Sequence, residues 1–305
     1  MQKAYICGCV RNCAQHLPKV FANIDRIGSL FAEIRILIAY DESTDGSLQV
    51  LNDLAEARPY MRILVNYHPM TNIRTQNISN ARNLMLTTIR QDADHRDFAY
   101  FMMIDCDEVC GRNMNLEHLA RFVNPTETNE IVAWDSISFN RGDYYDIWAF
   151  SNDPYVASCW NWENRQTSYQ FVCFLKKWII NELAKMGPDD LMPCYSAFNG
   201  FAIYRMSTYI NCRYEWNINH VMEITPKEWV EKQSNLLRKL MNSAPRSKFI
   251  SSGWIAKQSN ESNMHVYFTP TMDDCEHRYF HLQAVIEKGA KNWITPLCLF
   301  DEDAP

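Results

Sequence analysis

The feature that most constrains the fold of this sequence is an alternation, over its first 105 residues, of short apolar stretches with segments whose apolar residues have helical spacing. The apolar stretches predict strands at residues 4–10, 34–40, 62–66 and 98–104, and the periodic segments predict helices at residues 17–30, 48–55 and 79–90. Strands that alternate with helices form a parallel sheet, and ligands bind beyond the carboxyl ends of its strands. We therefore expect an α/β fold with a site in the polar loops that follow these strands.

The second half of the chain is less regular. Alternating apolar residues predict strands at residues 131–140 and 198–205, and helical spacing predicts helices at residues 225–241 and 275–288. Residues 215–265 are expected to form an insertion, which ends in a polar stretch at residues 243–262. The acidic residues 301–303 are expected to be solvated.

Composition narrows the class of protein. Hydrophobic residues make up 47% of the 305 residues and charged residues 22%, which is typical of a folded globular chain with a large core. The 30 Lys and Arg residues and 36 Asp and Glu residues give a net charge of −6. The chain therefore lacks the broad basic surface that binding to a phosphate backbone requires, and we expect no nucleic-acid partner.

The amino-terminal residues and the cysteines indicate the cellular setting. Residues 1–10 lack the basic flank and the long apolar core of a secretory signal. The apolar runs are far shorter than the ~20 residues of a membrane-spanning helix, so we expect a cytoplasmic protein without a transmembrane segment. The eleven cysteines contain no CxxC pair, which favours reduced, buried thiols over a disulfide framework.

The strongest chemical signal is Asp105-Cys106-Asp107, directly after the predicted strand at residues 98–104. Carboxylates at positions i and i+2 of an extended segment point to the same side, so Asp105 and Asp107 can approach one divalent cation. Phosphate oxygens and water would fill the remaining coordination positions. The alternative is a solvated acidic turn at the end of a strand.

Two further clusters belong to the same predicted sheet edge. Asp41 and Asp45 follow the second strand, where carboxylates can accept hydrogen bonds from ribose hydroxyls or a base N–H, although Asp45 can also cap the next helix. Arg74 and Arg82 precede the fourth strand, and a guanidinium presents the planar fork of donors that suits a pyrophosphate. An arginine on an exposed helical face is the alternative for both.

Taken in order, these segments resemble a known family. The series Val10-Arg11-Asn12, YDESTDGS, ISNARNLML and FMMIDCDE is similar to the nucleotide-sugar half of a GT-A glycosyltransferase, with the spacing of family 2-like enzymes and of capsule-associated, mannosyltransferase-type proteins. FNGFAIYR at residues 198–205 is similar to the acceptor strand, and DCEH at residues 274–277 to the acidic motif that opens the following helix. The chain departs from the pattern at Cys13, Glu42 and Asn199, which leaves the nucleotide preference open.

The resemblance implies a fold and a reaction. The fold would be a GT-A fold, a single Rossmann-like mixed sheet flanked by helices, in one catalytic domain over residues 1–305. Residues 1–110 would bind the nucleotide sugar and residues 111–305 the acceptor. The enzyme would be a hexosyl- or pentosyltransferase that moves a sugar from a nucleoside diphosphate donor to a carbohydrate hydroxyl with Mn²⁺ or Mg²⁺. Aromatic residues between 144 and 169 would form either a sugar-stacking surface or ordinary core.

The resemblance also implies roles for single residues. Glu276 would be the catalytic base of an inverting enzyme, and Asp107 would hold the catalytic metal. The metal ligands would be Asp105, Asp107 and His277. The donor would be bound by Val10, Arg11, Asn12, Asp41, Asp45, Arg74, Arg82, Asp105 and Cys106.

Other interpretations of these residues stay open at this stage. His277 and His281 lie four residues apart, which is also the spacing of a zinc-binding pair, and Glu276 could simply begin a helix near its positive dipole end. A nucleotidyltransferase also uses paired aspartates on an α/β sheet, but it would show a glycine-rich loop after the first strand, where this chain has Val10-Arg11-Asn12-Cys13. An inactive, glycan-binding scaffold is the third alternative.

Overall fold

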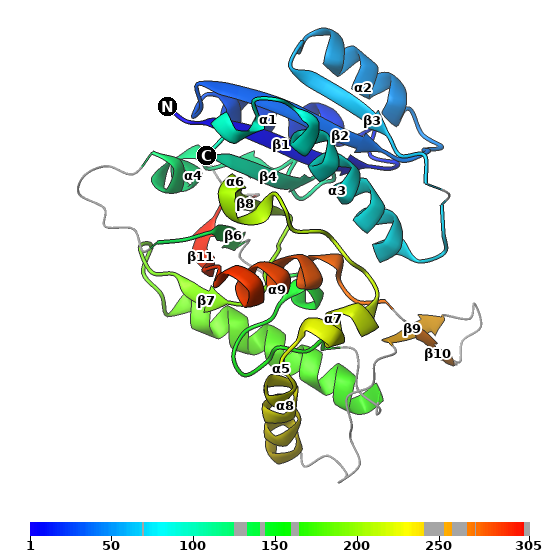
Figure 1. Ribbon diagram of the computed structural model, residues 1–305, viewed down its shortest axis with the longest axis vertical. Coiled ribbons are helices and arrows are strands. Elements are labelled where there is room, and N and C mark those ends of the chain that lie inside the picture. The colour runs from blue at the N-terminus through cyan, green and yellow to red at the C-terminus, as the bar shows by residue number, and fades with distance from the viewer. Residues whose placement is uncertain are drawn as a thin grey trace.

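The computed structural model describes residues 1–68, 70–124, 133–140, 144–159, 165–240, 253–257, 267–271 and 273–301. The predicted polar stretch at residues 243–262 lies mostly outside these residues, as do the first two residues of the strand predicted at 131–140 and most of the acidic tail. The rest forms a mixed sheet with helices on both faces (Figure 1). The predicted α/β class, one mixed sheet flanked by helices, is confirmed.

Eight strands form the central sheet, in the order β3-β2-β1-β4-β8-β6-β11-β7. Their bounds are β1 Lys3–Val10, β2 Glu33–Tyr40, β3 Met61–Val65, β4 Tyr100–Asp105, β6 Ser136–Asn140, β7 Met192–Cys194, β8 Phe201–Arg205 and β11 Asn292–Cys298. The first four strands of the chain pair in parallel, whereas β8 is antiparallel to both β4 and β6. The carboxyl ends of β1, β2 and β4 therefore meet at one edge, beside the start of β8.

Helices cover both faces of this sheet, because successive side chains of a buried strand point to opposite sides. Ile6 of β1 belongs to a core with α1 and α4, and Cys7 belongs to a second core with α3, α6 and α9. The helices are α1 Leu17–Gly28, α2 Ser47–Glu56, α3 Arg74–Gln91, α4 Leu116–Val123, α5 Arg165–Ala184, α6 Met206–Tyr209, α7 Ile218–Ile224, α8 Lys227–Leu240 and α9 Glu276–Lys288, with short 3₁₀ turns at His95–Asp97 and Ile147–Ala149.

The sequence missed one long helix and misplaced the start of another. The helix α5 buries Phe171, Leu175, Ile179 and Leu183, a stripe at i+4 spacing that packs in a third core with β7 and β11. The helix α3 begins at Arg74, five residues before the predicted start. Its first turns bury polar side chains in place of apolar ones, so the hydrophobic period on which the prediction relied is absent there.

The predicted insertion at residues 215–265 contains α7, α8 and the strand β9 Gly253–Lys257, which pairs antiparallel with β10 Tyr267–Thr271, just after the predicted end of the insertion. A second small pair, β5 Asn113–Met114 with β12 Phe300–Asp301, joins the carboxyl-terminal part of the chain to the loop after β4.

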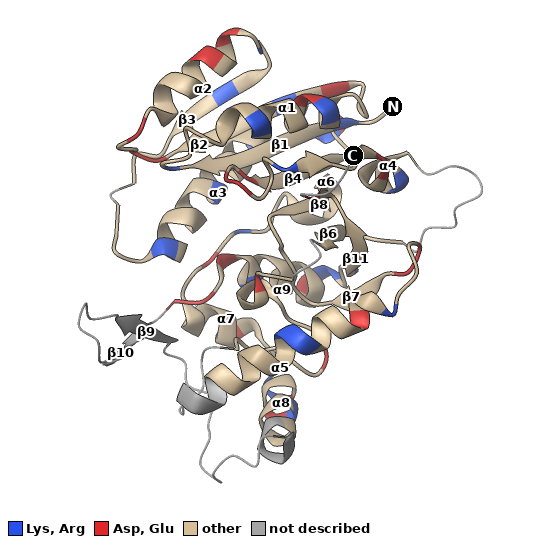
Figure 2. Ribbon diagram, turned by 180° about the vertical axis from the view of Figure 1, so that it is seen from behind, with Lys and Arg blue, Asp and Glu red and all other residues tan. Residues whose placement is uncertain are grey.

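Basic and acidic residues are interspersed along the helices (Figure 2). None of the helices in the described part of the chain has the length and apolarity of a membrane-spanning segment. All eleven cysteines carry free thiols.

Candidate active site at the carboxyl ends of the strands

A cavity of about 520 Å³ opens where β1, β2 and β4 end. The strand register places Tyr40 opposite Val10 and Asp105 opposite Cys9, so the loops after β2 and β4 flank the loop after β1. The helices α3 and α9, which share one core, complete the walls. The predicted site residues that line the cavity are Val10, Arg11, Asn12, Asp41, Arg74, Arg82, Asp105, Cys106, Asp107, Glu276 and His277.

Asp45 is the predicted site residue that does not line this cavity. Its Oδ1 accepts hydrogen bonds from the backbone N–H and the hydroxyl of Ser47, and its Oδ2 accepts one from the N–H of Ala14. These bonds tie the start of α2 to the loop after β1, which agrees with the capping alternative. Asn12 makes a similar cross-link, because its side-chain oxygen accepts from the N–H of Thr44 at 2.8 Å, and it also borders the cavity.

The Asp105-Cys106-Asp107 segment begins at the last residue of β4. Cys106 is buried in the core, where a Cβ on Gly8 would lie only 2.5 Å from its sulfur, so glycine at position 8 makes room for it. Asp105 and Asp107 line the cavity. Asp105 Oδ2 accepts a hydrogen bond from the Tyr145 hydroxyl at 3.0 Å, and Asp107 Oδ1 accepts one from the N–H of Val109 at 2.9 Å.

Burial raises the pKa of Asp105 to about 6, although the nearby Arg82 guanidinium opposes this rise. A second carboxylate, Asp107, raises the pKa further. A bound cation would favour the ionised form of Asp105 and so oppose this rise. Asp105 and Asp107 thus fit a divalent cation whose other ligands come from phosphate and water. Among the described residues, no three His, Cys, Asp or Glu side chains are arranged to hold a metal by themselves.

Arg82 lines the cavity, with its side chain only 7% exposed. Its guanidinium bonds to Glu276 Oε1 and to His277 Nε2, and it lies 3.6 Å from Asp105 Oδ1. The rings of Phe198 and Tyr214 lie 5.0 and 5.4 Å from its central carbon, within cation–π range. Arg82 therefore joins the strand-end carboxylates to the start of α9.

The two histidines of α9 are both buried. Burial and the Arg82 charge lower the pKa of His277 well below its usual value, so the ring is neutral and its Nε2 accepts from Arg82. His281 bonds to the Ser196 hydroxyl at 2.9 Å and to the Tyr204 hydroxyl at 3.1 Å. Both of its ring nitrogens are engaged by hydroxyl groups in the core, which does not favour the zinc-pair alternative.

The aromatic stretch at residues 144–169, for which the sequence left a sugar-stacking surface and ordinary core open, divides between the two, and it also brings in Asp146, to which no role was assigned. Tyr145, Asp146 and Trp148 line the cavity, whereas Tyr144 and Tyr155 of the same aromatic stretch belong to the core. The N–H groups of Tyr145 and Asp146 both donate to Asn199 Oδ1, at 3.1 and 3.3 Å. Asn199 was noted only as a departure from a glycine, and this pair of hydrogen bonds is a structural reason for it.

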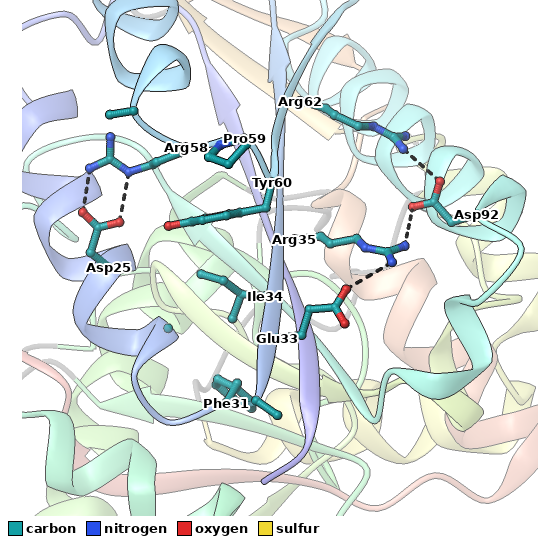
Figure 3. Close-up of a pocket in the computed structure, with 13 residues that line it drawn as sticks. Asp25, Phe31, Glu33, Ile34, Arg35, Arg58, Pro59, Tyr60, Arg62 and Asp92 are labelled. Carbon is teal, nitrogen blue, oxygen red and sulfur yellow. Dashed lines mark hydrogen bonds and ion pairs between the residues drawn. The ribbon is translucent and has the colours of Figure 1, made fainter.

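A second cavity, of about 850 Å³, lies at the opposite end of the strands, beside the starts of β2 and β3 (Figure 3). The three arginines that line it are ion-paired: Arg58 with Asp25, Arg62 with Asp92, and Arg35 with Glu33 and Asp92. None of the predicted site residues lines it. The candidate active site is therefore the smaller cavity at the carboxyl ends.

Comparison with known proteins identifies the class of protein. The family model "Glycosyl transferase family 2" matches residues 5–185, which is more than half of the 305 residues. The chain belongs to glycosyl transferase family 2. The predicted class of enzyme, a glycosyltransferase, is thereby confirmed. No curated protein sequence matches the chain.

Three solved structures are similar at low identity. The mannosyltransferase PcManGT from Pyrobaculum calidifontis, in complex with GDP-Man and Mn²⁺, is 11% identical over 67% of this chain and 45% of its own, with a TM-score of 0.34. TarS 1-349 of S. aureus is 11% identical over 75% and 53%, with a TM-score of 0.36. Glucosyl-3-phosphoglycerate synthase from Mycobacterium tuberculosis, in complex with UDP, is 10% identical over 91% of each chain, with a TM-score of 0.41. The chain thus spans about half of the length of the first two.

Proposed function

We propose that this glycosyltransferase moves a sugar from a nucleoside diphosphate donor to a hydroxyl of a glycan acceptor, and that it depends on Mn²⁺ or Mg²⁺. The observation that carries the proposal is the carboxylate pair Asp105 and Asp107, which opens into one cavity together with Asp41, Arg74 and Arg82. Carboxylates for a cation, guanidinium groups for a diphosphate and a buried carboxylate for a nucleoside are the parts that such a donor needs.

In this proposal the donor extends from β2 to β4. Asp41, held by the Asn66 amide at 2.7 Å, would bind the base or ribose, and the loop of Val10, Arg11 and Asn12 would lie along the nucleotide. Arg74 and Arg82 would face the diphosphate, with Cys106 as the buried spacer between the two carboxylates. Asp105 and Asp107 would hold the cation. His277 would join them only if Arg82 released its Nε2.

The reaction needs charge stabilisation on one side of the sugar and proton transfer on the other. A bound divalent cation would supply positive charge to the departing diphosphate. On the acceptor side, a carboxylate would take the proton of the attacking hydroxyl if the enzyme inverts the anomeric centre. Of the carboxylates that line the cavity, Glu276 and Asp146 are the two outside the proposed cation and nucleotide sites, and Glu276 is the one that the sequence predicted.

We also propose that residues 1–305 form one catalytic domain, with a donor half at 1–110 and an acceptor half at 111–305. Support comes from the cavity, which is lined by residues of both halves. The resemblance to capsule-associated mannosyltransferases stays a prediction. So does the choice between a hexosyl and a pentosyl group.

The direct test is a panel of nucleotide sugars, each incubated with the protein and Mn²⁺ or Mg²⁺ and scored for release of the nucleoside diphosphate. We expect turnover of at least one donor, and loss of that turnover in EDTA with recovery on adding back metal. A protein that binds glycans but turns over none of the donors would instead be an inactive scaffold, and full activity in EDTA would refute the metal dependence.

Asp41→Ala is expected to weaken the binding of the free nucleoside diphosphate and of the whole donor by a similar factor, about 10-fold. Both ligands carry the base and ribose, and loss of one hydrogen bond to a charged group costs about 1.5 kcal/mol or more. Titration calorimetry with each ligand measures this change. Glu42→Ala is the matched control, because Glu42 is the exposed neighbour and does not line the cavity. Unchanged affinities in Asp41→Ala would put the nucleotide elsewhere.

A further inference from the structure

Asp146 is a cavity residue to which the sequence assigned no role. It precedes the 3₁₀ turn Ile147–Ala149, between Tyr145 and Trp148, and all three residues line the cavity. Its backbone is held in place, because its N–H and that of Tyr145 both donate to Asn199 Oδ1. Next to Asn199, Gly200 has a positive φ of 92°. A Cβ there would lie 3.4 Å from the Tyr145 hydroxyl and 2.8 Å from Val109, so this turn requires glycine.

Tyr145 and Asp146 are adjacent in the chain, and one contacts the proposed metal site while the other lines the cavity beside it. The Tyr145 hydroxyl donates to Asp105, which belongs to the proposed metal site. The next side chain along the chain, Asp146, faces the same cavity together with Glu276 and Trp148. A carboxylate whose backbone is held by Asn199 thus lines the same cavity as the proposed donor site, and catalysis by a general base requires such a positioned group.

The carboxylates of Asp146 and Glu276 have different partners. Glu276 Oε1 bonds to the Arg82 guanidinium, in an ion pair whose side chains are 6% and 7% exposed. Within the described residues, the Asp146 carboxylate receives one hydrogen bond, from the neutral N–H of Ala149 to Oδ1 at 3.2 Å. Protonating Glu276 would leave the buried Arg82 charge with a weakened partner, whereas protonating Asp146 breaks no ion pair.

The surroundings of Asp146 also suit proton uptake. Burial raises the pKa of Asp146 to about 7, and the neighbouring carboxylates of Glu276 and Asp105 act in the same direction, whereas the Arg82 charge opposes them. A general base works best when its pKa lies near the working pH. The direction of this pKa shift therefore agrees with the contacts, which leave the Asp146 carboxylate outside any ion pair.

We propose that Asp146 is the catalytic residue that takes the proton of the acceptor hydroxyl, and that Glu276 is a positioning residue that holds Arg82. In the step, the acceptor O–H proton moves to Asp146 and the acceptor oxygen bonds to the anomeric carbon. The bond from that carbon to the diphosphate oxygen breaks, and the diphosphate leaves with the electron pair. This inference rests on the proposed function, with inversion at the anomeric centre.

The test compares Asp146→Asn with Glu276→Gln, using the donor found in the panel and titration calorimetry with its nucleoside diphosphate and Mn²⁺. Asp146→Asn should lower kcat by ~10²–10⁴-fold and leave the affinity for the diphosphate within about 2-fold, since a base acts on the acceptor proton alone. Glu276→Gln should weaken diphosphate binding, because Arg82 loses its charged partner. Asp189→Asn, at a carboxylate that is 74% exposed and outside the cavity, is the matched control.

The outcomes separate the two carboxylates. Transfer by Asp146→Asn at the wild-type rate, or a loss confined to kcat in Glu276→Gln, would overturn the proposal and restore Glu276 as the base. Absence of any donor turnover in the wild-type protein would overturn the proposed function itself, and the inference with it.

Formate gives a second measurement that does not depend on the amide variant. In Asp146→Ala, formate is small enough to enter the space left by the side chain and to act as a replacement base. We expect it to restore part of the transfer rate in Asp146→Ala. The comparison variant is Glu276→Ala, which also leaves a space for formate, and rescue of Glu276→Ala but not of Asp146→Ala would contradict the assignment. Thermal unfolding is the control for folding: we expect the Asp146 variants to unfold at the wild-type midpoint temperature, because protonating or removing Asp146 breaks no ion pair.

Discussion

Asp107→Ala is expected to reduce sugar transfer by at least about 10³-fold while the protein remains folded. Asp107 faces the cavity, and its carboxylate makes one described hydrogen bond to the protein, from the N–H of Val109. Little structure is therefore lost with it. A metal that stabilises the charge of a leaving group contributes several kcal/mol, and each 1.36 kcal/mol is a factor of ten in rate.

This expectation is checked by measuring initial transfer rates at saturating Mn²⁺, with the donor that the wild-type protein uses. Glu108→Ala is the matched control, because Glu108 is the adjacent acidic residue, is exposed and does not line the cavity. Circular dichroism and thermal unfolding should be the same for both variants and the wild type. Appreciable transfer by Asp107→Ala would mean that the carboxylate pair does not hold the catalytic cation.

Arg278→Met is expected to destabilise the fold by about 3–5 kcal/mol. Arg278 is fully buried in α9, where its Nε donates to Asp274 at 2.8 Å. Its other nitrogens donate to the carbonyls of Trp148, Phe150 and Val156 and to the Ser151 hydroxyl. Removing one partner of a buried ion pair leaves the other charge uncompensated, which is costly. It also frees the segment that follows Asp146.

Urea unfolding measures this loss as a change in the free energy of unfolding. Arg121→Met is the control, because Arg121 forms an ion pair with Asp189 at the surface, where such pairs contribute about 0–1 kcal/mol. The double variant Asp274→Asn/Arg278→Met should be more stable than Arg278→Met alone, since it removes the Asp274 charge that would otherwise stay buried without its partner. Burial already raises the pKa of Asp274, so the loss in Arg278→Met should shrink as the pH falls and this carboxyl takes up a proton. A loss below 1 kcal/mol would contradict the role of Arg278.

Much of the first half of the fold was predictable because its signals are local. In β1, β2 and β4 both faces are buried, so the strands read as continuous apolar runs. In α1 the residues Leu17, Val20 and Ile24 lie one turn apart and are buried. The start of α3 was predicted wrongly because polar residues replace the apolar stripe where that helix borders the cavity. The i+4 stripe of α5 was local too, and it was overlooked beside the aromatic stretch.

The order of the strands and their polar ends predicted, from the sequence alone, which loops line the cavity at the carboxyl ends of β1, β2 and β4. Asp41, Asp105 and Asp107 follow strands whose carboxyl ends share an edge, and the physics of a parallel sheet brings such ends together. The sequence could not predict which side chains of these loops point into the cavity. Asp45 follows the same strand as Asp41, yet its oxygens accept hydrogen bonds from Ala14 in the loop after β1 and from Ser47 at the start of α2, and its side chain does not line the cavity.

Only the tertiary structure brought Asp146 into the cavity. Asp146 is about 40 residues after Asp105 and about 130 before Glu276, and nothing in its local pattern marks it. It reaches the cavity because Asn199, at the turn before the antiparallel strand β8, binds its backbone. Arg82 likewise meets Glu276 and Asp105 through the packing of α3 against α9. Contacts between residues so far apart in sequence depend on how the layers pack, which hydrophobic periodicity alone does not encode.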